Sequence, residues 1–426
     1  MRLNCLMGAE NGLVRYVVFQ RGDVGQLRTS AGKRRGARWV LAGAVGLAVL
    51  AGPAASGAAV AASGPEVLSW GAGDGGQLGD GGRADRWSPG PVSGLDGGKV
   101  KEISAGGTGS DTSFAVARLD DNTVRAWGHN SAGQLGNGSR HDRAVPGVVS
   151  GLQGVDDVSA GGAHVLAVSG GRVWAWGENR DGQLGNNRFG DDSASPVRVP
   201  GIAMARQVAA GCDFSLALME DGTVWSWGSG VHGQLGTGER AAQSVPQEVK
   251  NVSGVAEIAA GCHHGVARTE DGVVWTWGDN SQGQLGDGSA KTSSSEPVKA
   301  RWLRDIDHIT AGADHTFAIR DNKTVYGWGS NRYGQFLEPE TGDDAGRANR
   351  NVPVEIEALA GAGEIAAGRS HNLAVFAKKG VVAWGANGQG QLGNGTNADR
   401  FTLVTAVTGD LQHVAASLAG NSSYAY

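Results

Sequence analysis

A ten-residue stretch, WGENRDGQLG at Trp176–Gly185, has seven copies along this chain of 426 residues. Successive copies begin 49 to 57 residues apart. Self-similarity at about 50 residues is typical of chains built from repeated structural units. The repeat therefore constrains the fold more than any single residue does. The copies begin at Trp70, Trp127, Trp176, Trp227, Trp277, Trp328 and Trp384.

Two positions inside the motif are nearly uniform among the copies. Three residues after the Trp only Gly or Asn occurs, and seven residues after it a Gln always occurs. Gly and Asn tolerate a left-handed backbone best, so we expect such a backbone at the first position. A side-chain amide repeated in a turn most simply caps backbone groups of that turn. The seven Gln are therefore interpreted as structural.

Each motif follows a stretch that alternates like a β-strand. A Val stands three residues before every Trp, so the two side chains point to opposite, apolar faces. Each unit holds three more strand-like pieces, which around Trp176 read VDDVSAGG, VLAVSG and SPVRVP. The first piece ends in small residues. Pairs such as Asp221-Gly222 favour two-residue hairpins between the second and third pieces. A Pro occurs in six of the fourth pieces, which favours an edge strand there.

Four-stranded antiparallel units repeated radially make a β-propeller. The sequence predicts an all-β fold: a seven-bladed β-propeller of four-stranded antiparallel blades, with the small-residue strand at the axis. The chain begins with a third strand at Val67–Gly71 and ends with a second strand at Ser423–Tyr426. We therefore expect both chain termini to close the last blade, which protects strand edges. A solenoid is the alternative, but it needs no half-units at its ends.

Residues 1–61 differ in kind from the expected propeller at residues 62–426. Basic residues between Lys33 and Arg38 precede an apolar run from Trp39 to Leu50, and Ala59-Val60-Ala61 fits a signal-peptidase site. We interpret the segment as a secretory signal whose true start lies downstream of Met1. An uncleaved membrane anchor is the alternative, although a run rich in Gly and Ala makes a weak span. We expect a secreted or cell-surface monomer without a stable membrane span.

The charge balance restricts the class of partner. Residues 62–426 hold 29 Lys and Arg against 40 Asp and Glu, a net charge of −11. Phosphate backbones are bound by clustered Lys and Arg. The sequence therefore disfavours nucleic acid as a partner.

Two cysteines occupy the same position in neighbouring units, Cys212 and Cys262 in the sequence AAGC. Equivalent positions of adjacent repeats are usually too far apart for a disulfide. We expect two buried thiols, and a disulfide formed on export is the alternative.

The sequences WGxNxxGQLGxG and AGxxHxLAV resemble the repeat of the regulator of chromosome condensation family over Val67–Tyr426. The resemblance implies a seven-bladed propeller that acts as an interaction platform, and the signal suggests a secreted, bacterial-type member. The family's founding member promotes guanine nucleotide exchange on the GTPase Ran and binds chromatin. A secreted β-lactamase inhibitor has a similar propeller. Nucleotide exchange and enzyme inhibition are therefore alternatives, but an exported acidic protein has no evident access to a nuclear GTPase.

The sequence contains no phosphate-loop ending, nucleophile elbow or C-x-x-C pair. His164, His264, His315 and His371 share one repeat position, expected near one end of the channel, where a ring of imidazoles could bind metal. We expect instead that each His hydrogen-bonds the backbone of its own blade. The prediction is a protein with no enzyme activity, no catalytic residue, no metal and no cofactor. A metal or enzymatic site at the channel mouth is the alternative.

The predicted function is a secreted, non-enzymatic module that binds a protein or extracellular polymer through one face of the ring. Strand directions alternate, so the one-to-two and three-to-four connections share a face, and variable loops on a rigid scaffold usually carry recognition. The insertions Thr108–Ser113 and Leu418–Ser422 are expected there, and Glu340–Asn351 is expected to form a protruding, mobile loop. Arg and aromatic residues are favoured anchors. The candidates are Arg83, Arg86, Trp87, Arg140, Arg143, Arg188, Phe189, Arg400 and Phe401.

Overall fold

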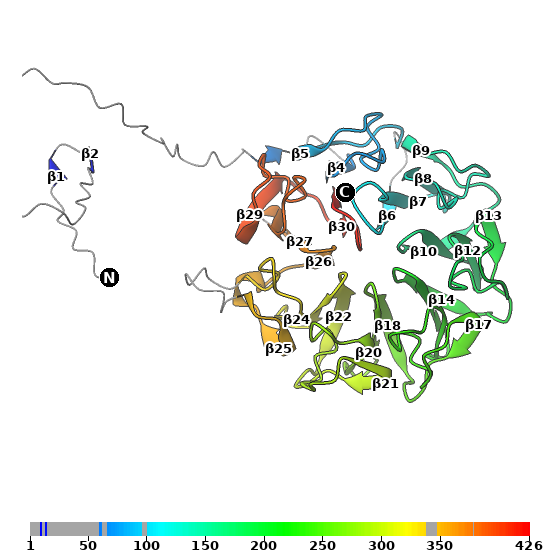
Figure 1. Cartoon of the computed structure of the whole chain (residues 1–426). Helices are drawn as coiled ribbons and strands as arrows, with labels where there is room; N and C mark the ends of the chain where they lie inside the picture. The colour runs from blue at the N-terminus through cyan, green and yellow to red at the C-terminus, as the bar shows by residue number, and fades with distance from the viewer. Residues whose placement is uncertain are drawn as a thin grey trace, which may run out of the picture. The chain divides into compact units, whose positions relative to one another are not determined.

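The structure is a computed structural model that describes residues 9–10, 13–14, 59–61, 66–95, 100–337, 347–377 and 379–426. The chain divides into two units, Met1–Ala54 and Ala55–Tyr426. In the first unit, β1 (Ala9–Glu10) pairs antiparallel with β2 (Leu13–Val14). The second unit is a ring of seven β-sheets, so the predicted propeller is confirmed (Figure 1).

Six blades are antiparallel sheets whose four strands follow one another in chain order. Blade 1 contains β6 (Val100–Gly106), β7 (Phe114–Leu119), β8 (Val124–Gly128) and β9 (Arg143–Val148). Blade 2 contains β10 (Val155–Ala160), β11 (His164–Ser169), β12 (Arg172–Gly177) and β13 (Ser193–Arg198). Blade 3 contains β14 (Ala205–Ala210), β15 (Phe214–Met219), β16 (Val224–Gly228) and β17 (Gln243–Glu248).

The next three blades repeat this order. Blade 4 contains β18 (Val255–Ala260), β19 (His264–Thr269), β20 (Val274–Asp279) and β21 (Ser293–Lys299). Blade 5 contains β22 (Ile306–Ala311), β23 (His315–Arg320), β24 (Val325–Gly329) and β25 (Arg350–Glu355), followed by the 3-10 helix η2 (Glu357–Leu359). Blade 6 contains β26 (Glu364–Ala367), β27 (His371–Phe376), β28 (Gly380–Gly385) and β29 (Arg400–Thr408).

Blade 7 is built from both ends of the chain. It joins β30 (Val414–Ala416) and β31 (Ser422–Ala425) to β4 (Leu68–Gly71) and β5 (Arg86–Pro91). Strands β31 and β4 are antiparallel neighbours, with Ala425 opposite Leu68 and Ser422 opposite Gly71. The predicted closure by the two termini is therefore confirmed.

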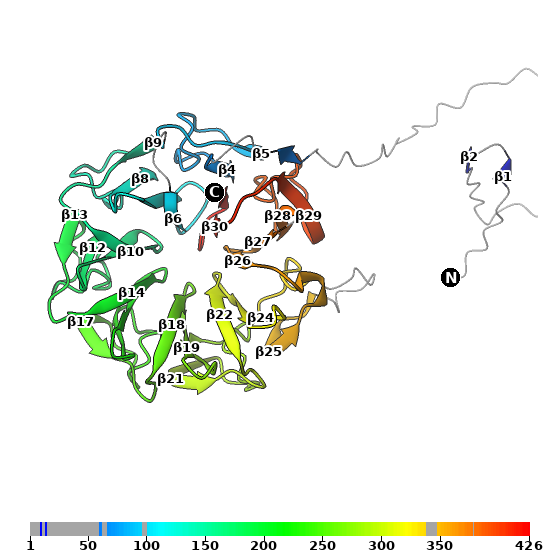
Figure 2. The ribbon, with the colours of Figure 1, turned by 180° about the vertical axis from the view of Figure 1, so that it is seen from behind.

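The first strand of every blade lines the central channel and the fourth strand lies at the rim, as the small residues and prolines predict (Figure 2). Six fourth strands contain a Pro, which has no N–H to offer a further strand. Strand β29 has no Pro, and its end pairs in parallel with β3 (Val60–Ala61). In the described residues, the six fourth strands that contain a Pro are the last strands of their sheets, and the one that lacks a Pro pairs with a fifth strand.

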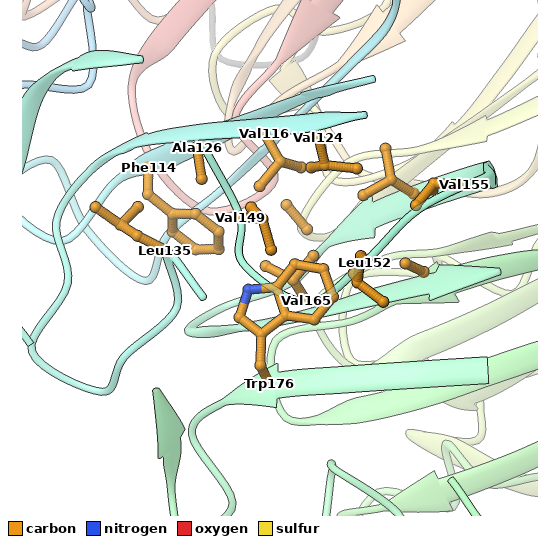
Figure 3. Packing of buried hydrophobic residues seen from close by; sticks show 13 residues of the cluster. Phe114, Val116, Val124, Ala126, Leu135, Val149, Leu152, Val155, Val165 and Trp176 are labelled. Atoms are coloured by element: carbon orange, nitrogen blue, oxygen red, sulfur yellow. The ribbon is translucent and has the colours of Figure 1, made fainter. Parts of the chain in front are cut away.

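The cores of the ring lie between blades. Trp176 packs on blade 1 with Phe114, Val116 and Leu135 (Figure 3). Val173 of the same strand packs instead toward blade 3. All seven motif Trp side chains are fully buried. Each indole Nε1 donates to the backbone oxygen of the motif Gln in the preceding blade, at 2.7 to 2.9 Å. The same contact thus closes every seam between blades, including both seams of blade 7.

The motif Gln fixes the loop that receives the Trp. Its Oε1 accepts from the backbone N–H two residues earlier, at 2.8 to 3.0 Å in all seven copies. The predicted capping role is confirmed. Gly185, which ends its motif, has φ +63°, and a Cβ there would lie 2.8 Å from Trp227 Nε1, so the seam requires glycine at this position.

The expectation of a left-handed backbone three residues after the Trp is wrong. No Asn at this position is among the described residues with positive φ. Asn130 acts through its side chain: Oδ1 accepts from Leu135 N–H at 2.9 Å and Nδ2 donates to His141 O at 2.9 Å. Gly replaces Asn where the loop carbonyl, such as Ala84 O beside Gly73, leaves no room for a Cβ.

The two faces of the ring carry different connections. The loop face is defined by the strand one-to-two and three-to-four connections, and the hairpin face by the two-to-three turns and the links between blades. Gly170-Gly171 forms the predicted two-residue turn, since Ser169 pairs with Arg172. The turn at Asp221-Gly222 is longer than predicted, because Met219 N–H donates to Thr223 O and three residues lie between them.

Candidate functional site

On the loop face the channel opens into a basin of 1080 Å³. One part of its wall comes from the strand one-to-two loops, including Cys212, Asp213, Cys262, His263 and Arg369. Thr108 and Asn421, from the two predicted insertions, also line it, so the insertions lie on the expected face.

The other part of the wall comes from the tryptophan motifs. Four of the seven copies contribute residues two, four or five positions after the Trp, which are motif positions that differ among copies. The Trp, Gln and Gly positions hold the frame, so these positions are free to vary without disturbing the seams. The residues concerned are Glu178, Arg180, Asp181, Gln282, Ser330, Arg332, Tyr333, Ala386, Gly388 and Gln389. Gln391, at the uniform Gln position, and Asp399 also line the basin.

Carboxylates gather on the blade 2 and blade 3 side of the basin. Burial, followed by the charges of neighbouring acids, raises the pKa of Glu178, and burial and Asp213 raise the pKa of Asp181. His263 Nδ1 lies 3.5 Å from Asp213 Oδ1, and this contact raises the pKa of His263. The centroid of the His232 ring lies 4.9 Å from that of the His263 ring, and the two rings are tilted by 33°. This wall therefore places three carboxylates beside Arg180 and His263.

A disulfide joins Cys212 to Cys262 at the basin wall, so the expectation of two free thiols is wrong. Their Cα atoms are 4.5 Å apart because the one-to-two loops of adjacent blades converge near the axis. Cys212 N–H also donates to Cys262 O at 3.1 Å. Leu418 and Ala419, from the blade 7 insertion, pack against the pair.

Replacing both cysteines, as Cys212→Ser with Cys262→Ser, is expected to lower the free energy of unfolding by about 2–4 kcal/mol, because the bridge restricts the unfolded chain. Thermal unfolding with and without reductant measures the effect. Reductant should lower the melting temperature of the wild-type protein and leave the double variant unchanged. Two thiols that react in the native, unreduced protein would contradict the assignment.

The four repeated histidines lie in the seams between blades and not in a ring around the channel. His164 Nε2 lies 3.0 Å from Ser215 Oγ on the next blade, and Ser215 in turn donates to Gln183 O at 2.8 Å. His264, His315 and His371 make the corresponding contacts with Thr316, Asn372 and Ser423. Each partner is on the following blade, which corrects the expectation of bonding within one blade.

Burial lowers the pKa of all four repeated histidines, to about 4 for His164 and about 3 for His264. Among the residues that the structure describes, no three His, Cys, Asp or Glu side chains form a group that could hold a metal ion. The repeated His position thus serves the seams and does not assemble the metal site considered from the sequence.

The channel itself, of 320 Å³, is bordered by polar side chains that join first strands. Asp157 Oδ2 accepts from Val208 N–H at 2.7 Å, and Glu364 Oε1 accepts from Val414 N–H at 3.2 Å. Burial and Asp157 raise the pKa of Glu102 to about 8. These groups hold adjacent blades together at the axis.

The predicted binding residues belong to four consecutive blades and do not form one cluster. Arg83 and Arg140, both thirteen residues after a Trp, bridge to the next blade through Asp142 at 3.0 Å and Asp192 at 3.3 Å. Arg86 pairs with Asp80, and Arg188 lies 3.5 Å from Asp191. These four arginines therefore have carboxylate partners.

The predicted aromatic residues lie at the loop-face rim. Trp87 is 45% exposed and Phe189 is 53% exposed. Trp87 packs against Gly390 and Phe401 against Gly334, each a motif glycine of the preceding blade. Arg143 folds along its own strand against Gly147, and Arg400 lies opposite Gly385 in the β28–β29 ladder. Of the nine predicted residues, only Phe401 adjoins the basin, through a side pocket that shares Arg332, Tyr333 and Asp399 with it.

Prediction from the sequence missed the basin residues because they lie inside the repeated motif. The uniform positions of that motif indicated a structural role, and this role was extended to the whole motif. The differences between copies at the second, fourth and fifth positions after each Trp were a usable signal. The predicted loop at Glu340–Asn351 is only partly testable, since residues 338–346 lie outside the described part of the chain.

The seams and the basin define a class of protein: a seven-bladed β-propeller in which repeated loops present variable side chains around one end of a channel. A family model of the RCC1-like domain matches residues 66–425. The chain belongs to this family.

Among its relatives is the ultraviolet-B receptor UVR8 of Arabidopsis thaliana, 34% identical over 348 residues, which cover 79% of this chain and 77% of UVR8. The human E3 ubiquitin-protein ligase HERC2 is 36% identical over 195 residues, which cover 42% of this chain and 4% of HERC2. The crystal structure of Prp20p from Saccharomyces cerevisiae has a TM-score of 0.74 at 23% identity and covers 86% of this chain and 92% of that one. These relatives are eukaryotic and lend no support to the expected bacterial type.

Proposed function

We propose that this chain is an exported, non-enzymatic binding module that docks a protein partner in the basin on its loop face. The observation that carries the proposal is that different positions of the motif have different roles. The Trp and Gln close the seams, while the positions that differ among copies line the basin. A rigid frame with variable side chains around one hollow is the usual architecture of a recognition site.

The basin has the chemistry of a protein-binding surface. On the side of blades 2 and 3 it contains Glu178, Asp181 and Asp213 together with Arg180, and on the side of blade 5 it contains Arg332 and Tyr333 together with Asp314. Arg and Tyr are enriched among residues that dominate binding energy, and complementary charge favours specific association. A protein of the same fold supports the proposal: the structure of Prp20p is described together with its binding properties to Gsp1p and histones.

Export is proposed from the basic and apolar pattern of residues 33–61, and the propeller is proposed to act as a monomer outside the cell. In the described residues, no helix has both the length and the apolar character needed to span a membrane. An extracellular polymer is the alternative partner, and nucleic acid is disfavoured by the charge of −11 over residues 62–426.

A bulky side chain placed in the basin tests the proposal. Gly388 lines the basin, has no positive φ, and an added Cβ meets nothing within 4 Å. Gly388→Trp is therefore expected to fold normally and to abolish capture of the partner by the immobilised protein. The readout is a quantitative comparison of proteins retained from the extracellular medium.

Gly363→Trp is the matched control. Gly363 is exposed beside β26 at the hairpin face, also without positive φ, and its Cβ would lie 3.7 Å from Val375 O. This variant should retain the partner. Equal retention by both variants, or loss only with Gly363→Trp, would refute the basin as the docking site. Retention of a carbohydrate polymer alone would refute a protein partner.

A further inference from the structure

A side pocket of 360 Å³ opens beside the basin, between the motif loop of blade 5 and the start of β29 in blade 6. Two arginines and two aromatic residues dominate its lining, Arg332, Tyr333, Arg347 and Phe401. Arg332 Cζ lies 5.8 Å from the Tyr333 ring centroid, and Arg347 Cζ lies 4.4 Å from the Phe401 ring centroid. The pocket thus combines two cations with two ring faces.

These two guanidinium groups differ from the other loop-face arginines. Arg83, Arg140 and Arg188 each pair with an aspartate. Within the described ranges, neither Arg332 nor Arg347 forms an ion pair, although the propeller region carries a net charge of −11. Among the described residues that line the pocket, two cations without an ion pair therefore stand against one carboxylate, Asp399.

The aromatic walls have fixed positions. Gly334 has φ +72°, and a Cβ at this residue would collide with the Phe401 ring, so the ring lies directly on the glycine backbone. Tyr333 N–H donates to Gln335 Oε1 at 2.9 Å, which fixes the loop that carries both Arg332 and Tyr333. A guanidinium stacked on such a ring keeps its N–H edge free for a planar anion.

The carboxylate Asp399 also lines the pocket and is fixed by a backbone hydrogen bond. Asp399 Oδ1 accepts from Asn387 N–H at 2.7 Å, in the role that Asp142 and Asp192 have in blades 1 and 2. Arg369 lines the adjoining part of the basin, where the charge of Asp314 lies close to it. A carboxylate that enters the side pocket therefore meets the guanidinium groups of Arg332 and Arg347, with Asp399 as the one described acid beside them.

Resting on the proposed function, we infer that the side pocket binds glutamate or aspartate side chains of an acidic segment of the partner protein. Each carboxylate accepts two N–H bonds from one guanidinium edge, a geometry that lysine does not provide. The aromatic rings exclude water around the ion pair and strengthen it. Blade 5 and blade 6 then select the partner by charge, opposite the acidic wall of blades 2 and 3.

Fluorescence anisotropy with a labelled hexaglutamate peptide tests the inference on the full propeller. The peptide should bind at low ionic strength, and added salt should weaken binding. Arg332→Ala with Arg347→Ala should weaken it at least tenfold, and Arg332→Lys with Arg347→Lys should restore only part of the loss. Arg188→Ala, which removes an exposed arginine from another blade, should leave binding unchanged. Melting temperatures should be unchanged, because all three arginines are exposed.

Three results would overturn the inference: no binding of hexaglutamate, equal binding by the double alanine variant, or displacement of the peptide by inorganic phosphate at concentrations where acetate has no effect. The last would assign the pocket to phosphate. Failure here is distinguishable from failure of the proposed function, which depends on partner capture being lost with Gly388→Trp. If Gly388→Trp loses capture of the partner but the unaltered propeller does not bind hexaglutamate, the basin remains the docking site and only the inference of an acidic partner segment is refuted.

Discussion

Removal of Ser422–Tyr426 is expected to prevent folding of the entire ring. The deletion removes β31, which is the strand between β30 and β4 in blade 7. It also removes the fully buried Tyr424, whose Oη donates to Gln77 O at 2.6 Å and whose ring lies 6.2 Å from that of Trp127. Both seams of blade 7 lose contacts, and two strand edges become exposed.

The readouts for the truncation are soluble yield and the thermal transition followed by circular dichroism. A peptide comprising residues 417–426, added during refolding, should restore part of the transition because it supplies the missing strand β31. Tyr424→Phe is the mild control, since it keeps the ring and loses only the hydroxyl. A truncated protein with the melting temperature of the full chain would show that blade 7 is not needed for closure.

Trp227→Ala is expected to lower the free energy of unfolding by about 3–5 kcal/mol, the range for a fully buried aromatic residue. Trp227 is completely buried between blades 2 and 3, where it packs with Leu184 and Val199. Its Nε1 donates to Gln183 O at 2.9 Å, so the variant also removes one of the two donors to that carbonyl, the other being Ser215 Oγ.

Chemical denaturation compares this variant with Trp302→Ala, the same substitution at a side chain that is 71% exposed on the hairpin face. The control should change stability by less than about 0.5 kcal/mol, as surface substitutions usually do. Trp227→Phe should fall between the two, because it keeps most of the apolar surface and loses the donor. Equal losses for Trp227→Ala and Trp302→Ala would refute the seam as the main source of stability.

The fold could be predicted from the sequence because each repeat of about 50 residues contains several independent patterns that indicate the same architecture. The Trp and Val on opposite faces predicted a strand buried on both sides, and Trp176 and Val173 indeed pack toward different blades. The half-units at the two ends predicted the pairing of β31 with β4. Both predictions use the order of residues within one repeat, so they require no knowledge of the distances between blades.

Contacts across blades could not be predicted in this way. Cys212 and Cys262 are 50 residues apart in sequence, and only the convergence of loops near the axis brings their Cα atoms to 4.5 Å. The same holds for His164, whose partner Ser215 belongs to the next blade. The nine predicted binding residues came from the long loops, whereas the curvature of the motif turn directs Asp181 and Arg332 into the basin.

The closure of blade 7 has a consequence for how such a chain can be arranged. Residues 66 and 426 lie at the same end of two neighbouring antiparallel strands, where every other blade has a two-to-three turn. A short linker between them would complete an ordinary hairpin, and the break could move to any of the other six turns. The contacts between blades would all remain in such a rearranged chain, so the stability of the ring depends on closing seven seams and not on which turn is left open.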